Sequence, residues 1–393
     1  MLLWVLALLF CSCTHNEGEK VEKVEVENYI PQPGMSVTDN ELVWTNSNTL
    51  PSPFANSDGS LISTPEQWEV RRDHIQKMLE EYVYGSRPTL KINKVEISAE
   101  YPDAAVSVNA ISYHAKIFYD NSRYFNIRVT RPRDEGNYPV IIRYEDNENF
   151  RFPIEKKGID DKRYVIVALN HLSVAPDNGV VTNKQMHETK VLMAWAYAAS
   201  LTVDYLETLQ FTDCSRIAIT GMSRTGKSAI CAGVYDKRFS VVVPNNSGAA
   251  GASGFRNFGE KNTQAINIVQ HQPTWVSEKL AQYRKNANEL PLDMHFARAL
   301  IAPRSILSTE AADGGDAVWA GPISTFKMWK ASDYAFELYG KTNNNLIHLR
   351  QGKHGQLNED YERMMQVINH TFYADSFDSS PYRKDIDYYD FFD

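Results

Sequence analysis

Hydrophobic and polar positions follow two different periods along this chain, which predict helices in some segments and strands in others. Residues 64–85 begin with Thr-Pro, carry apolar side chains at helical spacing and end at a glycine, so they predict an amphipathic helix. Short runs rich in β-branched and aromatic residues then predict strands over 94–98, 111–118, 124–130, 139–144 and 164–169.

Fully apolar strands alternate with helical segments through the rest of the chain. The pattern predicts a helix over 188–209 and another after a glycine-rich turn at 221–226, and it predicts strands over 216–220, 240–244, 305–309 and 346–350. Strands that are apolar on both faces are buried on both, and alternation with helices favours parallel pairing. We therefore expect an α/β fold, a three-layer sandwich with a mostly parallel central sheet, whose hairpin-like first strands form an antiparallel N-terminal edge.

The two ends of the hydropathy pattern suggest where the folded part begins. Residues 1–13 form a hydrophobic run too short to span a bilayer and are followed at once by polar residues, as in a signal segment. Cys13 follows a small residue in a loose lipoprotein box, so membrane attachment through a lipidated Cys13 stays open. We expect 14–48 to be a flexible tether and 49–393 to be a single catalytic domain, in a protein exported to the periplasm or held as an outer-membrane lipoprotein.

Composition narrows the classes of partner. Among 393 residues, 49 acidic and 41 basic side chains give a net charge of −8, which speaks against nucleic acid as a partner. After the signal segment only Cys214 and Cys231 remain, and we expect two free thiols or at most one disulfide. The His, Asp and Glu residues show no short metal-ligand spacing, so we expect no metal, no cofactor and a monomeric protein.

The turn at 221–226, within the segment RIAITGMSRTGKSAI, fits two different chemistries. As Gly-x-Ser-x-x-Gly it resembles a nucleophile elbow, in which small residues allow a sharp strand-to-helix turn that exposes Ser223, and the following amides face a developing oxyanion. As Gly221-x-x-x-x-Gly226-Lys227-Ser228 it also satisfies a phosphate-binding loop, in which amides and a lysine hold nucleotide phosphates.

The surrounding sequence favours the hydrolase over the nucleotide binder. A nucleotide hydrolase needs an acidic residue at the end of a later strand to hold magnesium, but strand 240–244 runs into Asn245 and Asn246. A triad hydrolase needs a serine, then an acid, then a late histidine, and His354 follows the last predicted strand.

Several longer motifs resemble the glucuronoyl esterases, carbohydrate esterase family 15, and within them the bacterial acetylxylan esterase-like branch. The motifs are GMSRTGK from Gly221, VVVPNNSGAAGASGFRNFGE from Val241, LPLDMHFARALIAPR from Leu290 and WAGP from Trp319. The resemblance implies an α/β-hydrolase fold and a serine esterase that hydrolyses esters of (4-O-methyl-)glucuronic acid in lignin-carbohydrate complexes or glucuronoxylan. A plant polysaccharide or another uronic-acid ester would then be the substrate.

The same resemblance implies a role for individual residues. Ser223 would attack the ester carbonyl, His354 would act as general base and then acid, and Arg224 would stabilise the oxyanion. Polar and aromatic side chains would bind the sugar, namely Lys227, Gln264, Gln272 and Trp319.

The triad acid is where this chain departs from many of those relatives. They carry a Glu where Asn246 stands here, and an asparagine can hold an imidazole but cannot balance its charge. The bacterial branch uses an Asp shortly before the Trp motif, and the loop AADGGDAVW offers Asp313 and Asp316. We favour Asp316 because it is nearer Trp319, keep Asp313 as the alternative and place Glu310 third.

Three other functions stay open: an acetylxylan or other carbohydrate acyl esterase, a non-catalytic carbohydrate-binding homologue, and a nucleotide binder of the phosphate-loop type. We expect structural roles for Arg256, with Glu260 as a partner, and for Asp293 as a helix-start residue. His295 matches a family position, whereas a histidine such as His171 is more often a surface or core residue.

Overall fold

The structure is a computed structural model, and it describes residues 50–56, 58–149, 155–161, 163–177, 189–258, 264–312 and 318–382. The predicted signal segment 1–13 with Cys13, the tether 14–48, and Asp313 and Asp316 lie outside the described residues. Among the helices within these ranges, none combines the length and apolar character needed to cross a membrane.

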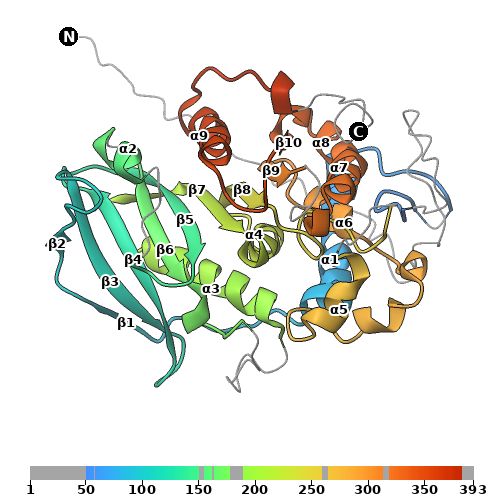
Figure 1. The fold of residues 1–393 in the computed structure, drawn as a ribbon, viewed down its shortest axis with the longest axis horizontal. Helices are drawn as coiled ribbons and strands as arrows, with labels where there is room; N and C mark the ends of the chain where they lie inside the picture. The colour runs from blue at the N-terminus through green and yellow to red at the C-terminus, as the bar shows by residue number, and fades with distance from the viewer. Residues whose placement is uncertain are drawn as a thin grey trace, which may run out of the picture.

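A single mixed sheet runs through the described residues (Figure 1). Its strands are β1 (Lys94–Ile97), β2 (Tyr101–Pro102), β3 (Ala110–Phe118), β4 (Tyr124–Pro132), β5 (Tyr138–Glu145), β6 (Val165–Asn170), β7 (Thr212–Met222), β8 (Phe239–Asn245), β9 (Ser305–Ala311) and β10 (Asn345–Arg350). Their order is β1-β3-β4-β6-β5-β7-β8-β9-β10, with β2 paired to β3. Every pair from β6 to β10 is parallel, and the pairs among β1 to β4 and between β4 and β6 are antiparallel. The predicted parallel sheet with an antiparallel N-terminal edge is confirmed.

Helices cover both faces of this sheet (Figure 1). They are α1 (Pro65–Leu79), α2 (Glu155–Asp160), α3 (Val191–Leu206), α4 (Arg224–Tyr235), α5 (Ile268–His271), α6 (Met294–Ala299), α7 (Pro322–Ala331), α8 (Asp333–Glu337) and α9 (Asn358–Tyr373). Val140 and Ile142 of β5 pack in the larger core, which also contains residues of α1, α3, α4 and α6, whereas Ile141 between them packs with residues of α9. Successive side chains of a strand point to opposite faces, so both faces of the sheet are buried and the three-layer sandwich is confirmed.

Two helices show how local sequence sets the ends of an element. Thr64 caps α1 by accepting the backbone N–H of Gln67 at 3.3 Å, and the helix continues as a π-helical turn over Glu80–Tyr84 before it ends at Gly85. Helix α9 was not among the elements predicted above. It follows β10 after the loop 351–357, and its apolar residues pack in the smaller core with Ile141 of β5 and Leu346 of β10.

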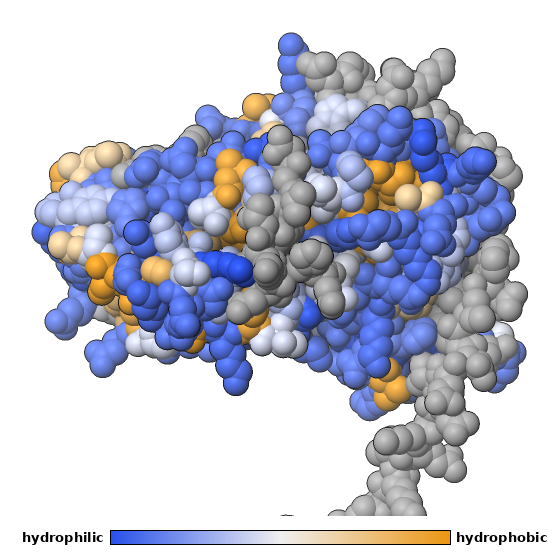
Figure 2. Space-filling view, turned by 90° about the horizontal axis from the view of Figure 1, so that it is seen from below, coloured by the Kyte–Doolittle hydropathy of each residue, from blue (hydrophilic) through white to orange (hydrophobic). Residues whose placement is uncertain are grey.

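The surface carries its exposed apolar side chains on separate elements. Figure 2 shows one face on which hydrophilic residues predominate and hydrophobic ones form patches separated by polar side chains. The exposed large hydrophobic residues within the described ranges are Leu61, Val70, Ile97, Val108, Tyr124, Leu172 and Leu357. Scattered side chains of this kind are normal on a folded domain and need no binding partner to explain them.

The segment that follows β8 is fastened to α6 by a buried ion pair. Arg256 Nη1 lies 2.9 Å from Asp293 Oδ2, and the two side chains are 1% and 0% exposed. Asp293 also accepts the backbone N–H groups of Phe255 and Met294, each at 2.8 Å, and so caps α6 as predicted. The expected partner of Arg256, Glu260, lies outside the described residues, and the partner seen here is Asp293.

We expect Asp293→Ala to lower the free energy of unfolding by about 3–5 kcal/mol, because the guanidinium of Arg256 stays buried without its counter-charge. Asp161→Ala is the matched control. It removes an exposed partner, 2.8 Å from Lys157 Nζ, and should cost at most about 1 kcal/mol. Urea denaturation of both variants measures the difference, and equal losses would contradict a special contribution of the buried pair.

Candidate active site

Ser223 occupies a strained turn between β7 and α4. Its backbone angles are φ 56° and ψ −121°, a conformation that costs a non-glycine residue about 1–3 kcal/mol. Its N–H donates to the carbonyl oxygen of Asn245 at 2.8 Å, which ties the turn to the end of β8. A Cβ on Gly221 would lie 2.5 Å from the carbonyl oxygen of Thr225, and one on Gly226 would lie 2.9 Å from Cβ of Ser247. These close approaches require glycine at both positions, and the geometry is that of a nucleophile elbow.

Lys227 of α4 points away from the turn, into the protein. Its side chain is fully buried, and Nζ donates to the carbonyl oxygens of Ser247 at 2.6 Å and Ala249 at 2.7 Å and to Oε1 of Gln264 at 2.8 Å. An ammonium group has three protons, so these acceptors use all of its donors. Burial lowers the pKa of Lys227 to about 7. A lysine held in this way does not serve a phosphate in the turn, which speaks against the nucleotide-binding interpretation.

Three of the four predicted sugar-binding residues meet around Gly248. A Cβ on this glycine would lie 3.2 Å from Lys227 Nζ, 3.2 Å from Gln264 Oε1 and 3.5 Å from Cζ3 of Trp319. The backbone N–H of Gln264 also donates to the carbonyl oxygen of Trp319 at 2.9 Å. The fourth residue, Gln272, is half-buried just after α5. The structure brings Lys227, Gln264 and Trp319 together and leaves Gln272 on a neighbouring segment.

The loop between β10 and α9 brings His354 to the same edge of the sheet. The ring of His354 lies 4.5 Å from the ring of Trp319, measured between centroids. The next residue, Gly355, accepts the side-chain amide of Asn246 on its carbonyl oxygen at 2.9 Å. Asn246 follows Asn245, which in turn binds the backbone of Ser223. The serine turn and the histidine loop are therefore connected through two consecutive residues.

Glu310 is the one of the three candidate acids that lies within the described residues. It is fully buried near the end of β9, and burial raises the pKa of its carboxyl group to about 8. A carboxyl group that is mostly protonated at neutral pH does not provide the negative charge that a triad acid supplies to the imidazolium. This environment therefore does not favour Glu310 as a triad acid, and the order of Asp316 and Asp313 stays a prediction.

Two carboxylates that the sequence analysis missed hold Arg224. Its Nη2 donates to Asp146 Oδ1 at 2.8 Å, and its Nε lies 3.5 Å from Asp177 Oδ1. Asp146 directly follows β5, and Asp177 follows the short helical turn after β6. The carboxyl ends of parallel strands are where α/β proteins place functional side chains, and this rule was a signal that could have found both residues.

The other candidate histidines have structural contacts. The Nδ1 of His171 lies 2.7 Å from the carbonyl oxygen of Glu145, and Nε2 of His295 lies 2.8 Å from that of Pro51. Both rings are buried, and burial lowers the pKa of each to about 4, so both are neutral at pH 7. His171 is thus a core residue, one of the two kinds of position that the sequence analysis expected for it.

The described residues contain no cluster of three or more His, Cys, Asp or Glu side chains that suits a metal ion. Cys214 is half-buried and Cys231 is buried, and both are free thiols. Of the two predicted alternatives, two free thiols or one disulfide, the structure shows the first.

Comparisons with known proteins point to one group of enzymes. A family model described as "Glucuronyl esterase, fungi" matches residues 118–340. The chain is 26% identical to a carbohydrate esterase of an unknown prokaryotic organism, with 82% of this chain and 89% of that protein covered. It is 28% identical to the 4-O-methyl-glucuronoyl methylesterase of Neurospora crassa, over 78% and 76% of the two chains. A solved family 15 glucuronoyl esterase from Caldicellulosiruptor kristjansonii superimposes with a TM-score of 0.71 at 27% identity, covering 86% of this chain and 94% of that one.

The buried carboxyl group of Glu310 should leave a signature in the pH dependence of stability. Between its ordinary pKa of 4.5 and its raised pKa of about 8, the folded protein keeps a proton that the unfolded chain releases, so this group makes stability fall as pH rises. Lys227, with a pKa of about 7 in the folded protein, is protonated in both states below about pH 6 and adds no slope there, and above that pH it makes stability rise with pH in both proteins. We expect Glu310→Gln to lose less stability than the wild type from about pH 5 to about pH 7.

Urea denaturation across that pH range measures the two slopes. Glu289→Gln, a change at an exposed glutamate, is the control and should keep the wild-type slope. Parallel curves for the wild type and Glu310→Gln would contradict a protonated Glu310 in the folded protein.

Proposed function

Because the chain belongs to the glucuronyl esterase family, we propose that it is a serine esterase acting on ester bonds of (4-O-methyl-)glucuronic acid in lignin-carbohydrate complexes or glucuronoxylan. Relatives named 4-O-methyl-glucuronoyl methylesterase support this substrate class. The observation that carries the proposal is the connection of the Ser223 elbow to the His354 loop through Asn245 and Asn246.

The first half of the reaction forms an acyl-enzyme. The Ser223 hydroxyl gives its proton to the imidazole of His354 while its oxygen attacks the ester carbonyl carbon. The carbonyl oxygen becomes an oxyanion, and Arg224 with the first amides of α4 stabilises it. Asp146 and Asp177 hold the guanidinium of Arg224 in place, which reduces the reorganisation needed when charge develops.

Departure of the alcohol completes the first half, and the second half then releases the uronic acid. When the tetrahedral intermediate collapses, the bond to the alcohol breaks and the imidazolium of His354 gives the alcohol its proton. Water, deprotonated by His354, then attacks the acyl-enzyme, and Ser223 leaves with that proton. The uronate stays attached to the enzyme between the two halves, so contacts to the sugar act in both steps.

We assign contacts to the sugar to Gln264, Gln272 and Trp319, and we assign to Lys227 the positioning of Gln264, because three protein oxygens already use all of its donors. Gln264 and Trp319 lie beside Gly248, and both are half-buried, so part of each residue remains exposed. Lys227 is fully buried and donates from Nζ to Oε1 of Gln264, which fixes the orientation in which the Gln264 amide would meet a sugar hydroxyl.

We assign the triad acid to Asp316, with Asp313 as the alternative, because both stand in the loop that leads from β9 to Trp319. Burial raises the pKa of the Glu310 carboxyl group to about 8, and Asn246 carries a neutral amide. The negative charge that balances the imidazolium of His354 would therefore come from that loop.

From the sequence we further propose that 49–393 form one catalytic domain and that 1–13 direct export. Attachment of the exported protein to a bacterial outer membrane through a lipidated Cys13 and a monomeric state complete the proposal.

Hydrolysis of benzyl glucuronate by the purified protein tests the proposed substrate class, with an acetyl ester of a xylo-oligosaccharide as the comparison. We expect turnover of the glucuronate and a loss of at least about 10⁴-fold in kcat for Ser223→Ala, because no other group replaces the nucleophile. Ser240→Ala, at the opposite end of β8, should keep wild-type rates. Turnover of the acetyl ester alone would assign an acyl esterase, and turnover of neither ester would contradict both assignments.

The identity of the acid follows from two matched variants, Asp316→Asn and Asp313→Asn. We expect Asp316→Asn to lower kcat by up to about 10⁴-fold, since the neutral amide cannot balance the imidazolium charge. Asp313→Asn should stay near the wild type. The reverse order would move the role to Asp313, and two small losses would refute an acid in this loop.

A further inference from the structure

Asn246 stands at the strand end where many relatives carry the triad acid, yet its contacts in this protein are those of an amide. It is fully buried with φ 42°, in the left-handed region that asparagine adopts more readily than most residues. Its backbone N–H donates to the carbonyl oxygen of Thr309, and its Oδ1 accepts the N–H of Ala311, both at 2.8 Å. One side of Asn246 therefore extends the β8–β9 pairing by one residue.

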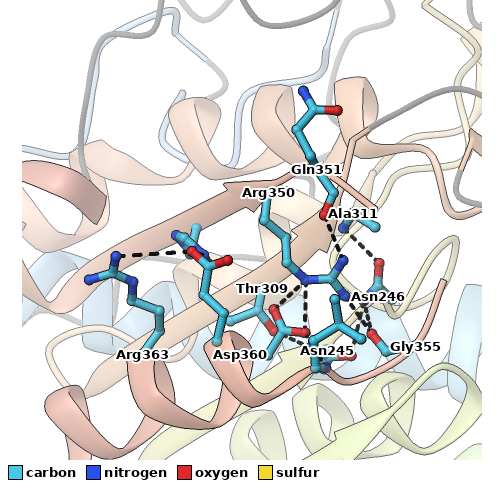
Figure 3. Close-up of polar contacts among 12 residues, drawn as sticks. Asn245, Asn246, Thr309, Ala311, Arg350, Gln351, Gly355, Asp360 and Arg363 are labelled. Carbon is cyan, nitrogen blue, oxygen red and sulfur yellow. Dashed lines mark hydrogen bonds and ion pairs between the residues drawn. The ribbon is translucent and has the colours of Figure 1, made fainter. Parts of the chain in front are cut away.

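The other side of Asn246 acts as a donor. Its Nδ2 donates to the carbonyl oxygen of Gly355 at 2.9 Å and lies 3.0 Å from Oδ1 of Asn245 (Figure 3). Both neighbours are acceptors, so a carboxylate at this position would set oxygen against oxygen in a buried place. The amide cannot be exchanged for the acid without loss of the bond to Gly355.

Arg350, at the end of β10, binds backbone carbonyl groups of the same loop. Its Nη2 donates to the carbonyl oxygen of Gly355 at 2.6 Å, and its Nη1 donates to those of Gln351 at 3.1 Å and Lys353 at 3.3 Å. The residues before and after His354 are thus both held by their backbone carbonyl groups.

Asp360, in the first turn of α9, completes the arrangement. Its carboxylate oxygens lie 2.8 and 2.9 Å from Arg350 Nε, and its Oδ2 accepts the N–H of Leu357 at 2.8 Å. Arg350 is 3% exposed and Asp360 is fully buried. The pair is neutral as a whole, and its remaining hydrogen-bonding groups face the loop 351–357.

We propose that Asn246, Arg350 and Asp360 form a histidine clamp that positions the backbone on both sides of His354, and that Asn246 acts in it as a hydrogen-bond donor, a role that a carboxylate cannot take. Through Asn246, the clamp joins Asn245, which binds the Ser223 turn, to Gly355, which follows the base. It therefore fixes the distance between nucleophile and base. This inference rests on the proposed function, because it assigns His354 as the base.

The test compares Asn246→Asp with Asn344→Asp. Asn344 is a matched control because its amide also donates to a backbone carbonyl, that of Pro303 at 2.7 Å, but lies before β10 and away from His354. We expect Asn246→Asp to lower kcat on benzyl glucuronate by about 10- to 100-fold with KM within about two-fold, since a displaced base slows the chemistry and leaves sugar contacts intact. Asn344→Asp should keep kcat within about two-fold.

A second variant keeps the proposal testable if Asn246→Asp folds poorly. Arg350→Lys removes the fork that reaches Gly355 and should lower kcat while KM stays within about two-fold, whereas Arg363→Lys, at a half-buried arginine of α9 that binds no residue of the loop, should leave kcat unchanged. Asn246 and Arg350 donate to the same carbonyl oxygen of Gly355. The fold-decrease in kcat of the double variant Asn246→Ala, Arg350→Lys should therefore be smaller than the product of the decreases in the two single variants.

Hydrogen exchange of the amides 352–357 separates this inference from the proposed function. In Asn246→Asp these amides should exchange at least about tenfold faster than in the wild type, even if no uronate ester is hydrolysed. A variant Asn246→Asp as active as the wild type, or with unchanged exchange in this loop, would overturn the clamp. Equal losses of kcat in Asn246→Asp and Asn344→Asp would also overturn it, because they would indicate a general loss of stability.

Discussion

The backbone of Ser223 is held in a conformation that a serine does not adopt freely, and the rest of the site is arranged around this constraint. The turn is maintained by the bond from its N–H to the carbonyl oxygen of Asn245 and by glycines at 221 and 226 that permit close backbone contact. Because Asn245 ends β8, the position of the nucleophile depends on the pairing of β7, β8 and β9. The loop that carries His354 is attached to the same strand end, through the bond from Asn246 to Gly355.

Buried charge supplies much of that attachment. Lys227 is surrounded by carbonyl oxygens, Arg350 is paired with Asp360, and Arg256 is paired with Asp293. Charges in such places are stabilising only when their partners are already in place, so each of them penalises an alternative arrangement of the loops. The same burial lowers the pKa of Lys227 and raises that of Glu310. The proposed catalytic residues Ser223 and His354 stand on loops, and the buried polar groups hold those loops in a fixed position.

Sequence reasoning reached the features that depend on local pattern. Gly221 and Gly226 flanking Ser223 indicated the turn, and the apolar strands indicated the sheet. Helix α9 was not predicted, although Tyr361, Met364, Ile368 and Phe372 have the spacing of one buried helix face and marked it in the sequence. The strand order β4-β6-β5 carries no periodic signal. Asn246 binds residues 65 and 109 positions away, so neither contact could be predicted from neighbouring residues.

The account depends on Ser223 being an activated nucleophile, and covalent labelling tests that claim most directly. The protein would be treated with a sulfonyl fluoride, which reacts with activated serines, digested, and analysed by mass spectrometry beside a His354→Ala variant. The account predicts one adduct, on the peptide that contains Ser223, and its loss in His354→Ala because the base is absent. An unlabelled Ser223, or labelling that persists without His354, would contradict it.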